Sequence, residues 1–202
     1  MKAASPQVLV STRSNCKASK WSPPWGVAIC LLGLNAFFGL MQPAVAEQKC
    51  SAESIAVSLP TDAFLDQGDG TVLDQRSKLI WMRCAAGQTW RNGQCDGQAQ
   101  QYSWESAQAV ASEVNRQGAF FYNDWRVPSL RDLAMITERQ CQNPRTNLTV
   151  FPGTPADFFW TSSALRDAFK GDQFYALDFG AQGVQLRRPH EAFYVRLVRN
   201  SQ

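Results

Sequence analysis

The chain has 202 residues, of which 45% are hydrophobic and 18% charged, proportions typical of a folded globular protein rather than a disordered or collagen-like chain. Its formal net charge is +3, but residues 1–46 carry four basic residues and no acidic one, so residues 47–202 hold 16 basic and 17 acidic residues. A nearly neutral remainder has no overall field that attracts nucleic acid or an anionic membrane. Nucleic-acid binding is therefore not expected.

Residues 1–46 have the order of a secretory signal peptide. Basic residues precede an apolar run, Val27–Leu40, which is followed by the small-residue motif Ala44-Val45-Ala46. The run is shorter than the roughly 20 residues that a helix needs to cross a bilayer. We therefore predict cleavage after Ala46, export to the periplasm, the cell surface or the medium, and no transmembrane segment after cleavage. An uncleaved membrane anchor is the alternative.

Four cysteines follow the predicted cleavage site, namely Cys50, Cys84, Cys95 and Cys141. An even number of cysteines in an oxidising compartment predicts two disulfides. Cys84 and Cys95 flank a polar, glycine-containing loop, which favours a local bridge and leaves Cys50 to pair with Cys141. The alternative, a zinc site of four thiolates, lacks a C-x-x-C pair, so no metal is expected.

A single domain over residues 62–200 is expected after a lead-in at residues 47–61. Its first strands are expected at residues 64–65, 71–74 and 79–82. Aspartate and glycine residues at 66–70 favour a hairpin turn between the first two strands. Three aspartates here also permit a calcium site, but the stretch lacks the acidic density and closing glutamate of a calcium loop. They are Asp66, Asp69 and Asp74.

Two helices are expected next. Ser103 is the predicted N-cap of the first helix, whose apolar residues recur at helical spacing up to Gly118. The second helix begins after Ser129, where Asp132 forms an acidic variant of the capping box, and its buried stripe extends to residues 136–137. A polar loop with three prolines follows over residues 141–157. Loops of this length in a compact domain are usually functional or mobile.

The C-terminal third is rich in β-branched and aromatic residues, which predicts strands. The strands are expected at residues 158–163, 174–179, 184–186 and 193–198. A tight turn is expected at 180–183. Because the helices are grouped between two sets of strands, the sequence predicts an α+β fold with two helices packed on an antiparallel sheet.

Five motifs occur in a fixed order along the chain. They are DGTVLD with LIWMRC (69–74, 79–84), YSWESA (102–107), DWRVPS (124–129), FWTSS (159–163) and YVRLVR (194–199). Together they resemble the Lcl C-terminal domain family, named for a bacterial collagen-like adhesin, and the resemblance covers about residues 62–199.

This resemblance implies a disulfide-bonded C-type-lectin-like fold, export from a bacterial cell and a role in surface binding. In the namesake protein the domain binds sulfated polysaccharides of the host. The chain departs from the family in two respects: it has no collagen-like repeat, and Leu197 stands where many members carry cysteine.

Groups for known catalytic chemistry are scarce. His190 is the only histidine, and the sequence contains no G-x-S-x-G, Walker or G-x-G-x-x-G motif. We therefore expect a binding or adhesion protein without cofactor, rather than an enzyme. One alternative is a structural or assembly component of a bacterial envelope complex. The other is an enzyme of the formylglycine-generating type, which shares the C-type-lectin-like fold and requires an unpaired cysteine.

Basic residues near the C-terminus are the candidate binding site. They are Arg187, Arg188 and His190, with Arg166 and Lys170 in an earlier loop. If they converge, they would hold a sulfated or carboxylated glycan through charge-assisted hydrogen bonds. The alternative partner is an envelope protein. An ordinary solvated face is the alternative reading of the same residues.

Tryptophans divide into one binding candidate and several core candidates. Trp90 lies in the loop between the two paired cysteines, where its ring would stack on a sugar or simply cover the disulfide. Trp81, Trp125 and Trp160 are expected in the core because aromatic residues at helical or alternating positions usually pack. Arg126, next to Trp125, is expected to pair with a carboxylate or with loop carbonyls.

Overall fold

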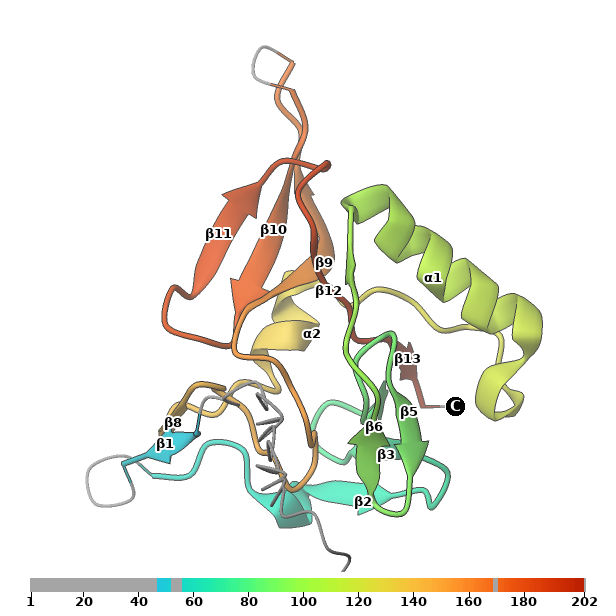
Figure 1. Cartoon of the computed structure of the whole chain (residues 1–202), viewed down its shortest axis with the longest axis vertical. Helices are drawn as coiled ribbons and strands as arrows, with labels where there is room; N and C mark the ends of the chain where they lie inside the picture. Colours follow the sequence, from blue (N-terminus) through green and yellow to red (C-terminus); the bar gives the residue numbers. More distant parts are fainter. Residues whose placement is uncertain (1–46, 52–55, 169–170, 202) are drawn as a thin grey trace, which may run out of the picture. The chain divides into compact units, whose positions relative to one another are not determined.

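The computed structural model describes residues 47–51, 56–168 and 171–201, so the predicted signal peptide and Lys170 lie outside it. The described residues form an α+β domain with two disulfides and several sheets (Figure 1). The two α-helices are α1, Trp104–Gln117, and α2, Leu130–Ala134, and two single-turn helices are η1, Thr61–Ala63, and η2, Ala119–Phe121.

The domain contains two main sheets rather than one. The five-stranded sheet has the order β11-β10-β9-β12-β7. Its strands are β7 (Gln101–Tyr102), β9 (Phe158–Leu165), β10 (Gln173–Asp178), β11 (Val184–Arg187) and β12 (Phe193–Tyr194). All its pairings are antiparallel except β9 with β12.

The four-stranded sheet has the order β13-β4-β3-β2 and is antiparallel. Its strands are β2 (Phe64–Asp66), β3 (Thr71–Asp74), β4 (Leu79–Met82) and β13 (Val198–Asn200). Two short ribbons complete the domain. They pair β1 (Lys49–Cys50) with β8 (Cys141–Gln142) and β5 (Thr89–Arg91) with β6 (Gln94–Asp96).

The hairpin of β2 and β3 forms around the predicted aspartate–glycine turn. The carboxylate of Asp69 accepts hydrogen bonds from both the amide and the hydroxyl of Thr71, which fixes the start of β3. Gly70 has φ +98°, and a Cβ at this position would lie 2.7 Å from a ring carbon of Trp90. Both the backbone conformation and the close approach therefore require glycine here.

Both helices begin at the residues that the sequence predicts. The hydroxyl of Ser103 accepts from the Ser106 amide at 3.3 Å, and Gly118 ends α1 in the left-handed conformation. Ser129 and Asp132 form a reciprocal capping box at α2. The second helix is shorter than the apolar stripe indicates, because the backbone leaves the helix after Ala134 in three-residue turns while Ile136 remains buried.

The predicted strand over residues 193–198 is instead divided between the two sheets. Tyr194 pairs with strands β7 and β9, whereas Val198 pairs with β4. Between these two residues, the chain already bonds to the four-stranded sheet, since the Leu197 carbonyl accepts from the Met82 amide of β4 at 3.1 Å. The C-terminal segment therefore crosses from one sheet to the other.

Arg196 occupies this crossing and is buried, with a residue exposure of 1%. Its guanidinium donates to the carbonyls of Met82 (3.0 Å) and Arg83 and to the Thr154 hydroxyl (2.7 Å), and lies over the Phe151 ring. Burial lowers the pKa of Arg196 to about 9, so the group stays protonated at neutral pH. Through these hydrogen bonds Arg196 links the crossing between the two sheets to the loop at residues 151–154.

The apolar core consists of two clusters. One cluster lies between the sheets and α2 and includes Trp81, Leu133, Ile136, Phe151 and Phe159. The other lies under α1 and includes Ala107, Ala111, Trp125, Trp160 and Phe174. Trp81 and Trp160 have no exposed surface, and the Trp160 indole donates to the Tyr102 carbonyl at 2.7 Å.

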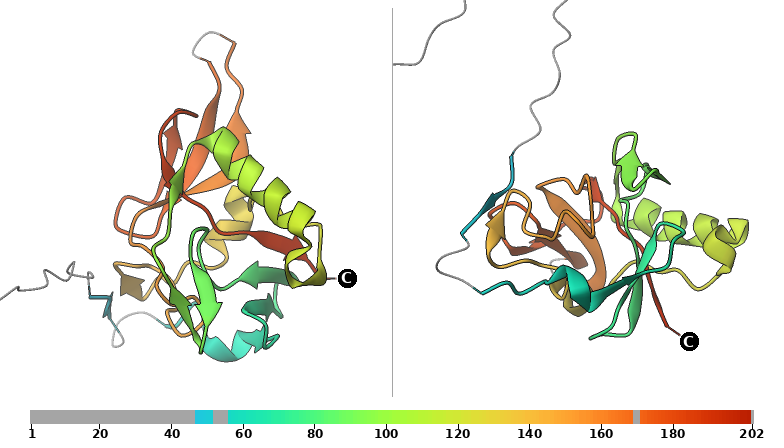
Figure 2. Two further views of the ribbon diagram at one scale, coloured as in Figure 1. Left: turned by 45° about the vertical axis from the view of Figure 1, so that its right-hand side comes forward. Right: turned by 90° about the horizontal axis from the view of Figure 1, so that it is seen from below.

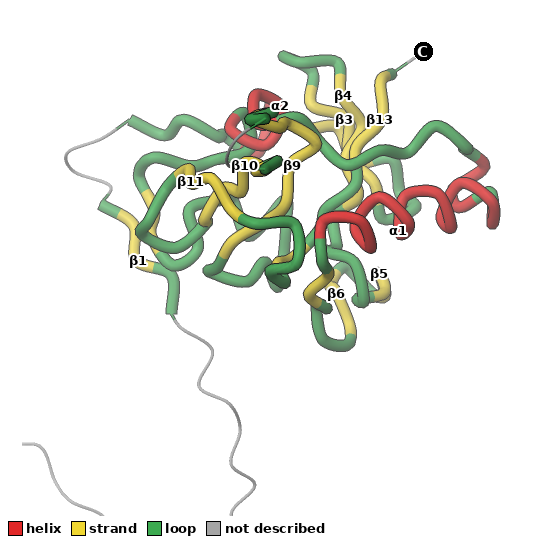
Figure 3. Tube along the Cα trace, turned by 90° about the horizontal axis from the view of Figure 1, so that it is seen from above, coloured by secondary structure: helices red, strands yellow, loops and turns green. Residues whose placement is uncertain are grey.

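Both predicted disulfides are present. Cys84–Cys95 closes the β5–β6 hairpin, and Cys50–Cys141 joins the paired strands β1 and β8. The β1–β8 ribbon and α1 lie at opposite ends of the domain (Figures 1, 2 and 3). Within the described residues, neither helix has the length and apolarity needed to span a bilayer.

Candidate functional site

The predicted basic residues lie around one end of the five-stranded sheet, where acidic side chains accompany them. Arg166, which follows β9, forms an ion pair with Asp172. Arg187 Nη1 lies 3.6 Å from a carboxylate oxygen of Glu191, and the Arg187 guanidinium stacks 4.3 Å from the centre of the Phe158 ring. These two guanidinium groups are therefore already engaged within the fold.

Arg188 and His190 are exposed at the same end. The Arg188 amide donates to Glu191 at 2.6 Å, and its guanidinium reaches toward Gly171, in the loop that also contains Asp172. The structure thus brings the described members of the predicted cluster near one another, together with acids that offset their charge.

Trp90 lies far from that cluster, on the β5–β6 hairpin (Figures 1 and 2). Its ring stands over Gly70, and the Arg83 guanidinium lies 4.1 Å from the ring centre. The ring also lines a mainly apolar cavity of about 260 Å³ between the hairpin and α1, together with Val110 and Phe120. Part of the Trp90 ring surface is therefore already covered by Gly70 and Arg83.

Arg126 is tied to the start of α2. Its guanidinium donates to Asp132 at 2.8 Å, and the same carboxylate accepts from the Ser129 amide. Burial would raise the pKa of Asp132, but the hydrogen bonds from Arg126 and Ser129 lower it overall. The ion pair with Arg126 therefore keeps the Asp132 carboxylate of the capping box ionised.

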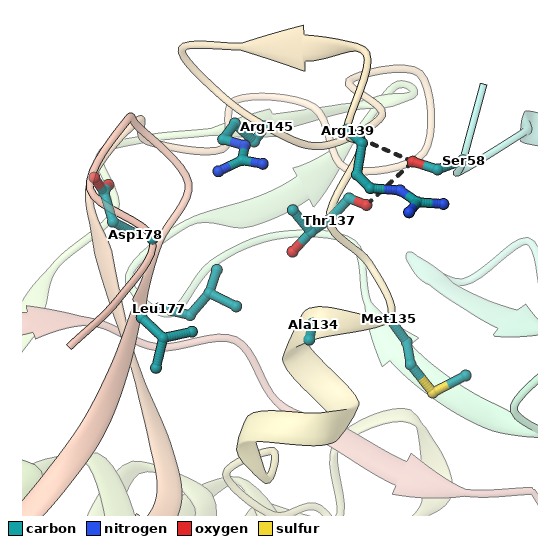
Figure 4. A pocket seen from close by; sticks show the side chains of 10 residues that line it. Ser58, Ala134, Met135, Thr137, Arg139, Arg145, Leu177 and Asp178 are labelled. Atoms are coloured by element: carbon teal, nitrogen blue, oxygen red, sulfur yellow. Dashed lines mark hydrogen bonds between the residues drawn. The ribbon is translucent and has the colours of Figure 1, made fainter. Parts of the chain in front are cut away.

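A larger cavity, of about 440 Å³, lies between α2, the segment that follows it and the β10–β11 turn (Figure 4). We call it the arginine cavity. Its lining combines polar and charged groups with an apolar floor: Thr137, Arg139, Arg145, Asp178, Met135 and Leu177.

The main chain positions both arginines of this cavity. The Arg139 amide donates to the Ser58 hydroxyl at 2.8 Å, and the Arg145 amide donates to the Phe179 carbonyl at 2.6 Å. Among the described residues, neither guanidinium has a hydrogen-bond or ion-pair partner. Both side chains are therefore held at their base and available at their charged end.

Figure 4 shows that the two arginines lie apart along the cavity rather than converging on one point. Arg145 points into the space between Asp178 and Thr137, whereas Arg139 extends on the other side of Thr137, beside Ser58. This spacing offers two separate cationic contacts along one open depression.

Asp178 is the acidic group of the cavity, but its oxygens are engaged. The side chain is almost fully buried and accepts hydrogen bonds from the amides of Gly180 (2.6 Å) and Gln182 (2.7 Å). A Cβ on Gly180 would lie 2.8 Å from the Asp178 carboxylate, so only glycine fits beside it. Asp178 therefore shapes the turn, and the lining retains two cationic groups against one carboxylate.

Glu138 anchors the segment that carries the arginines. Its buried carboxylate accepts from the Leu59 amide (2.7 Å), the Ser58 hydroxyl (2.8 Å) and the Gln140 amide (2.8 Å). Burial by itself would raise the pKa of Glu138, but the hydrogen bonds from Gln140, Ser58 and Leu59 lower it overall. The carboxylate is consequently ionised at neutral pH.

The model of the Lcl C-terminal domain family matches residues 70–199 of the chain. The chain belongs to the Lcl C-terminal domain family. No curated protein matches it. The family match includes both arginines of the cavity but begins after β2, so it leaves out the segment at residues 47–60.

Sequence reasoning missed the arginine cavity of this Lcl C-terminal domain. Arg139 and Arg145 are separated by five residues that include a cysteine and a proline, and Glu138 precedes them, so no local excess of charge marks them. The available signal was the length of the polar loop at 141–157, which contains Arg145. In the described part of this domain, no three His, Cys, Asp or Glu side chains gather into a metal-binding group.

Proposed function

We propose that this Lcl C-terminal domain is an exported, non-catalytic module of the adhesin type that binds an anionic polysaccharide in the arginine cavity. The observation that carries the proposal is the pair of guanidinium groups, Arg139 and Arg145, which have no partner among the described residues and line an open cavity.

The chemistry of the lining favours a chain with repeated acidic groups. Arginine binds sulfate and carboxylate groups through paired hydrogen bonds. Because the two guanidinium groups lie apart, a polymer with acids on successive sugars contacts both, whereas a single small anion contacts one. The volume of about 440 Å³ lies within the range of about 300–1,000 Å³ typical of small-ligand sites. Met135 and Leu177 offer apolar surface for the C–H face of a sugar ring.

The compartment that we propose is extracytoplasmic: periplasm, cell surface or medium. Two disulfides are compatible with an oxidising environment, and the predicted signal peptide supplies a route to it. We also propose that the fold is C-type-lectin-like, on the strength of the family membership.

The cysteines bear on the enzymatic alternative. An oxidase of the formylglycine-generating type needs an unpaired thiol, but each cysteine in the described residues belongs to a disulfide. Non-catalytic binding is therefore the function that the described side chains support best.

Retention of the mature protein on immobilised heparin, polygalacturonate and neutral dextran tests the proposal. We expect salt-sensitive retention on the two anionic polymers and none on dextran; comparison of heparin with polygalacturonate shows whether sulfate or carboxylate is preferred. The double variant Arg139→Ala/Arg145→Ala should lose at least about tenfold in affinity, because each charged hydrogen bond contributes roughly 1.5–3 kcal/mol.

A matched control keeps the overall charge change the same. Arg91→Ala/Arg131→Ala removes two exposed arginines outside the cavity and should bind within about twofold of wild type. Equal loss in the two double variants would mean that only net charge matters. Loss in Arg187→Ala/Arg188→Ala instead would move the site to the C-terminal cluster, and no retention of wild type would refute the proposed function.

A further inference from the structure

The lead-in lies outside the family match, yet its described residues, 47–51 and 56–60, bond directly to the segment that carries both arginines. Strand β1 pairs with β8 at Cys50 and Cys141, and the disulfide joins the same two residues. The Ser51 amide continues the ladder by donating to the Gln140 carbonyl at 2.9 Å. The covalent link therefore falls between Arg139 and Arg145 in the sequence.

Hydrogen bonds from the lead-in reach both sides of Arg145. The Gln48 side chain donates to the Pro144 carbonyl at 2.6 Å and to the Thr146 carbonyl at 2.7 Å. A single side-chain amide thus donates to the carbonyls of the two residues that flank Arg145. This contact orients the backbone from which that arginine projects.

The second part of the lead-in holds Arg139 in the same way. The Ser58 hydroxyl accepts from the Arg139 amide, and the amides of Ser58 and Leu59 donate to Glu138, the preceding residue. The Asn147 side chain donates to the Leu59 carbonyl at 3.0 Å. In the described residues the Arg139 amide has no other hydrogen-bond acceptor than Ser58.

We propose that the lead-in, residues 47–51 and 56–60, is a positioning element of the binding site, and that Cys50–Cys141 and Gln48 set the placement of Arg139 and Arg145. This inference rests on the proposed function, because it concerns affinity at the same cavity. It places residues that determine binding in a part of the chain that the family match does not cover.

Removal of the disulfide in the mature protein tests the inference. Cys50→Ser/Cys141→Ser should lower the affinity for heparin or polygalacturonate about fivefold or more, measured well below the melting temperature of the variant. The control Cys84→Ser/Cys95→Ser removes the other disulfide, which does not line the arginine cavity, and should leave affinity within about twofold of wild type.

Gln48→Ala provides a second test that leaves both disulfides in place. We expect a twofold to fivefold loss of affinity, while Gln142→Ala, an exposed glutamine on β8, should have no effect. In an Arg139→Ala/Arg145→Ala background, or in Arg139→Ala where residual binding is measurable, removal of Cys50–Cys141 should cost less affinity than in wild type. A purely structural role predicts the same cost in every background.

The two proposals fail in different ways. If the oxidised wild-type protein binds neither polymer, the proposed function is wrong. If wild type binds and the arginine double variant does not, but both Cys50→Ser/Cys141→Ser and Gln48→Ala bind as tightly as wild type, only the positioning role is wrong.

Discussion

The C-terminal third of the domain and the segment at residues 138–146 both carry arginines, and the two regions use them differently. In the C-terminal third, Arg166 and Arg187 pair with acids, and Arg196 donates to carbonyls in the core. In the 138–146 segment the backbone is fixed, but the guanidinium groups of Arg139 and Arg145 have no partner among the described residues.

The density of basic residues in a sequence is therefore a poor guide to the charge that is available for binding. The stretch with the tightest basic cluster also contains Asp172 and Glu191, which pair with Arg166 and Arg187 once the chain folds. The two arginines of the cavity are spaced more widely, and the nearby acids, Glu138 and Asp178, bond to main-chain amides instead.

The largest expected difference between the two regions is in how much an arginine contributes to the free energy of unfolding. Arg196→Ala should lower the free energy of unfolding by about 3–5 kcal/mol, because it leaves buried carbonyls and the Thr154 hydroxyl without a donor and removes a packed side chain. Arg145→Ala should change it by less than about 0.5 kcal/mol. Urea unfolding of both variants measures the contrast, and equal destabilisation would mean that the cavity arginine also serves the fold.

A smaller, pH-dependent effect is expected at Glu138. Hydrogen bonds lower its pKa in the folded protein below the ordinary value of 4.5, so its stabilisation is present above pH 4.5 and is lost as the pH falls through the folded pKa. Glu138→Gln should therefore cost about 1.5–3 kcal/mol near pH 7, and the difference from wild type should shrink below pH 4.5. Unfolding free energies from pH 3 to 7 test this, and a difference independent of pH would contradict it.

The smallest effect is expected when the acids of the C-terminal region are removed, because its arginines then lack carboxylate partners, as the cavity arginines do. Asp172→Ala/Glu191→Ala removes the acids that offset Arg166 and Arg187, and should raise the affinity for heparin about twofold to threefold. Ion pairs at a protein surface are typically worth only about 0.2–1 kcal/mol each. Titration of wild type and variant in the same buffer measures the gain. An increase beyond tenfold would show that the C-terminal cluster is itself a binding site held in check by its acids.

Much of the fold was predictable because local chemistry decides it. The caps at Ser103 and Ser129 and the turn before Thr71 follow from residue types at fixed spacing. The disulfides follow from the local loop between Cys84 and Cys95, which leaves one other pair. The division of the predicted 193–198 strand was not predictable, since alternation of apolar residues continues through the crossing at Arg196. Which sheet each half joins depends on distant residues: Tyr194 pairs with Gln101 and Phe159, and Val198 pairs with Trp81.

The site was harder to predict for the same reason. The backbone around Arg139 is held by Ser58, and that around Arg145 by Phe179 and Gln48. These residues come from two distant parts of the chain, the lead-in and the residue after β10. No local motif signals such an assembly. A sequence shows where charges are, but only the fold shows which of them lack a partner.

Side-chain NMR of the arginines shows which guanidinium groups bind the polysaccharide. The Nε–Hε resonances of the mature protein would be followed during titration with a heparin-derived or polygalacturonate oligosaccharide, with assignments from single arginine variants. If the oligosaccharide binds in the arginine cavity, the resonances of Arg139 and Arg145 should shift saturably and those of Arg166 and Arg187 should stay unchanged. Shifts of Arg166 and Arg187 with Arg139 and Arg145 unchanged would contradict it.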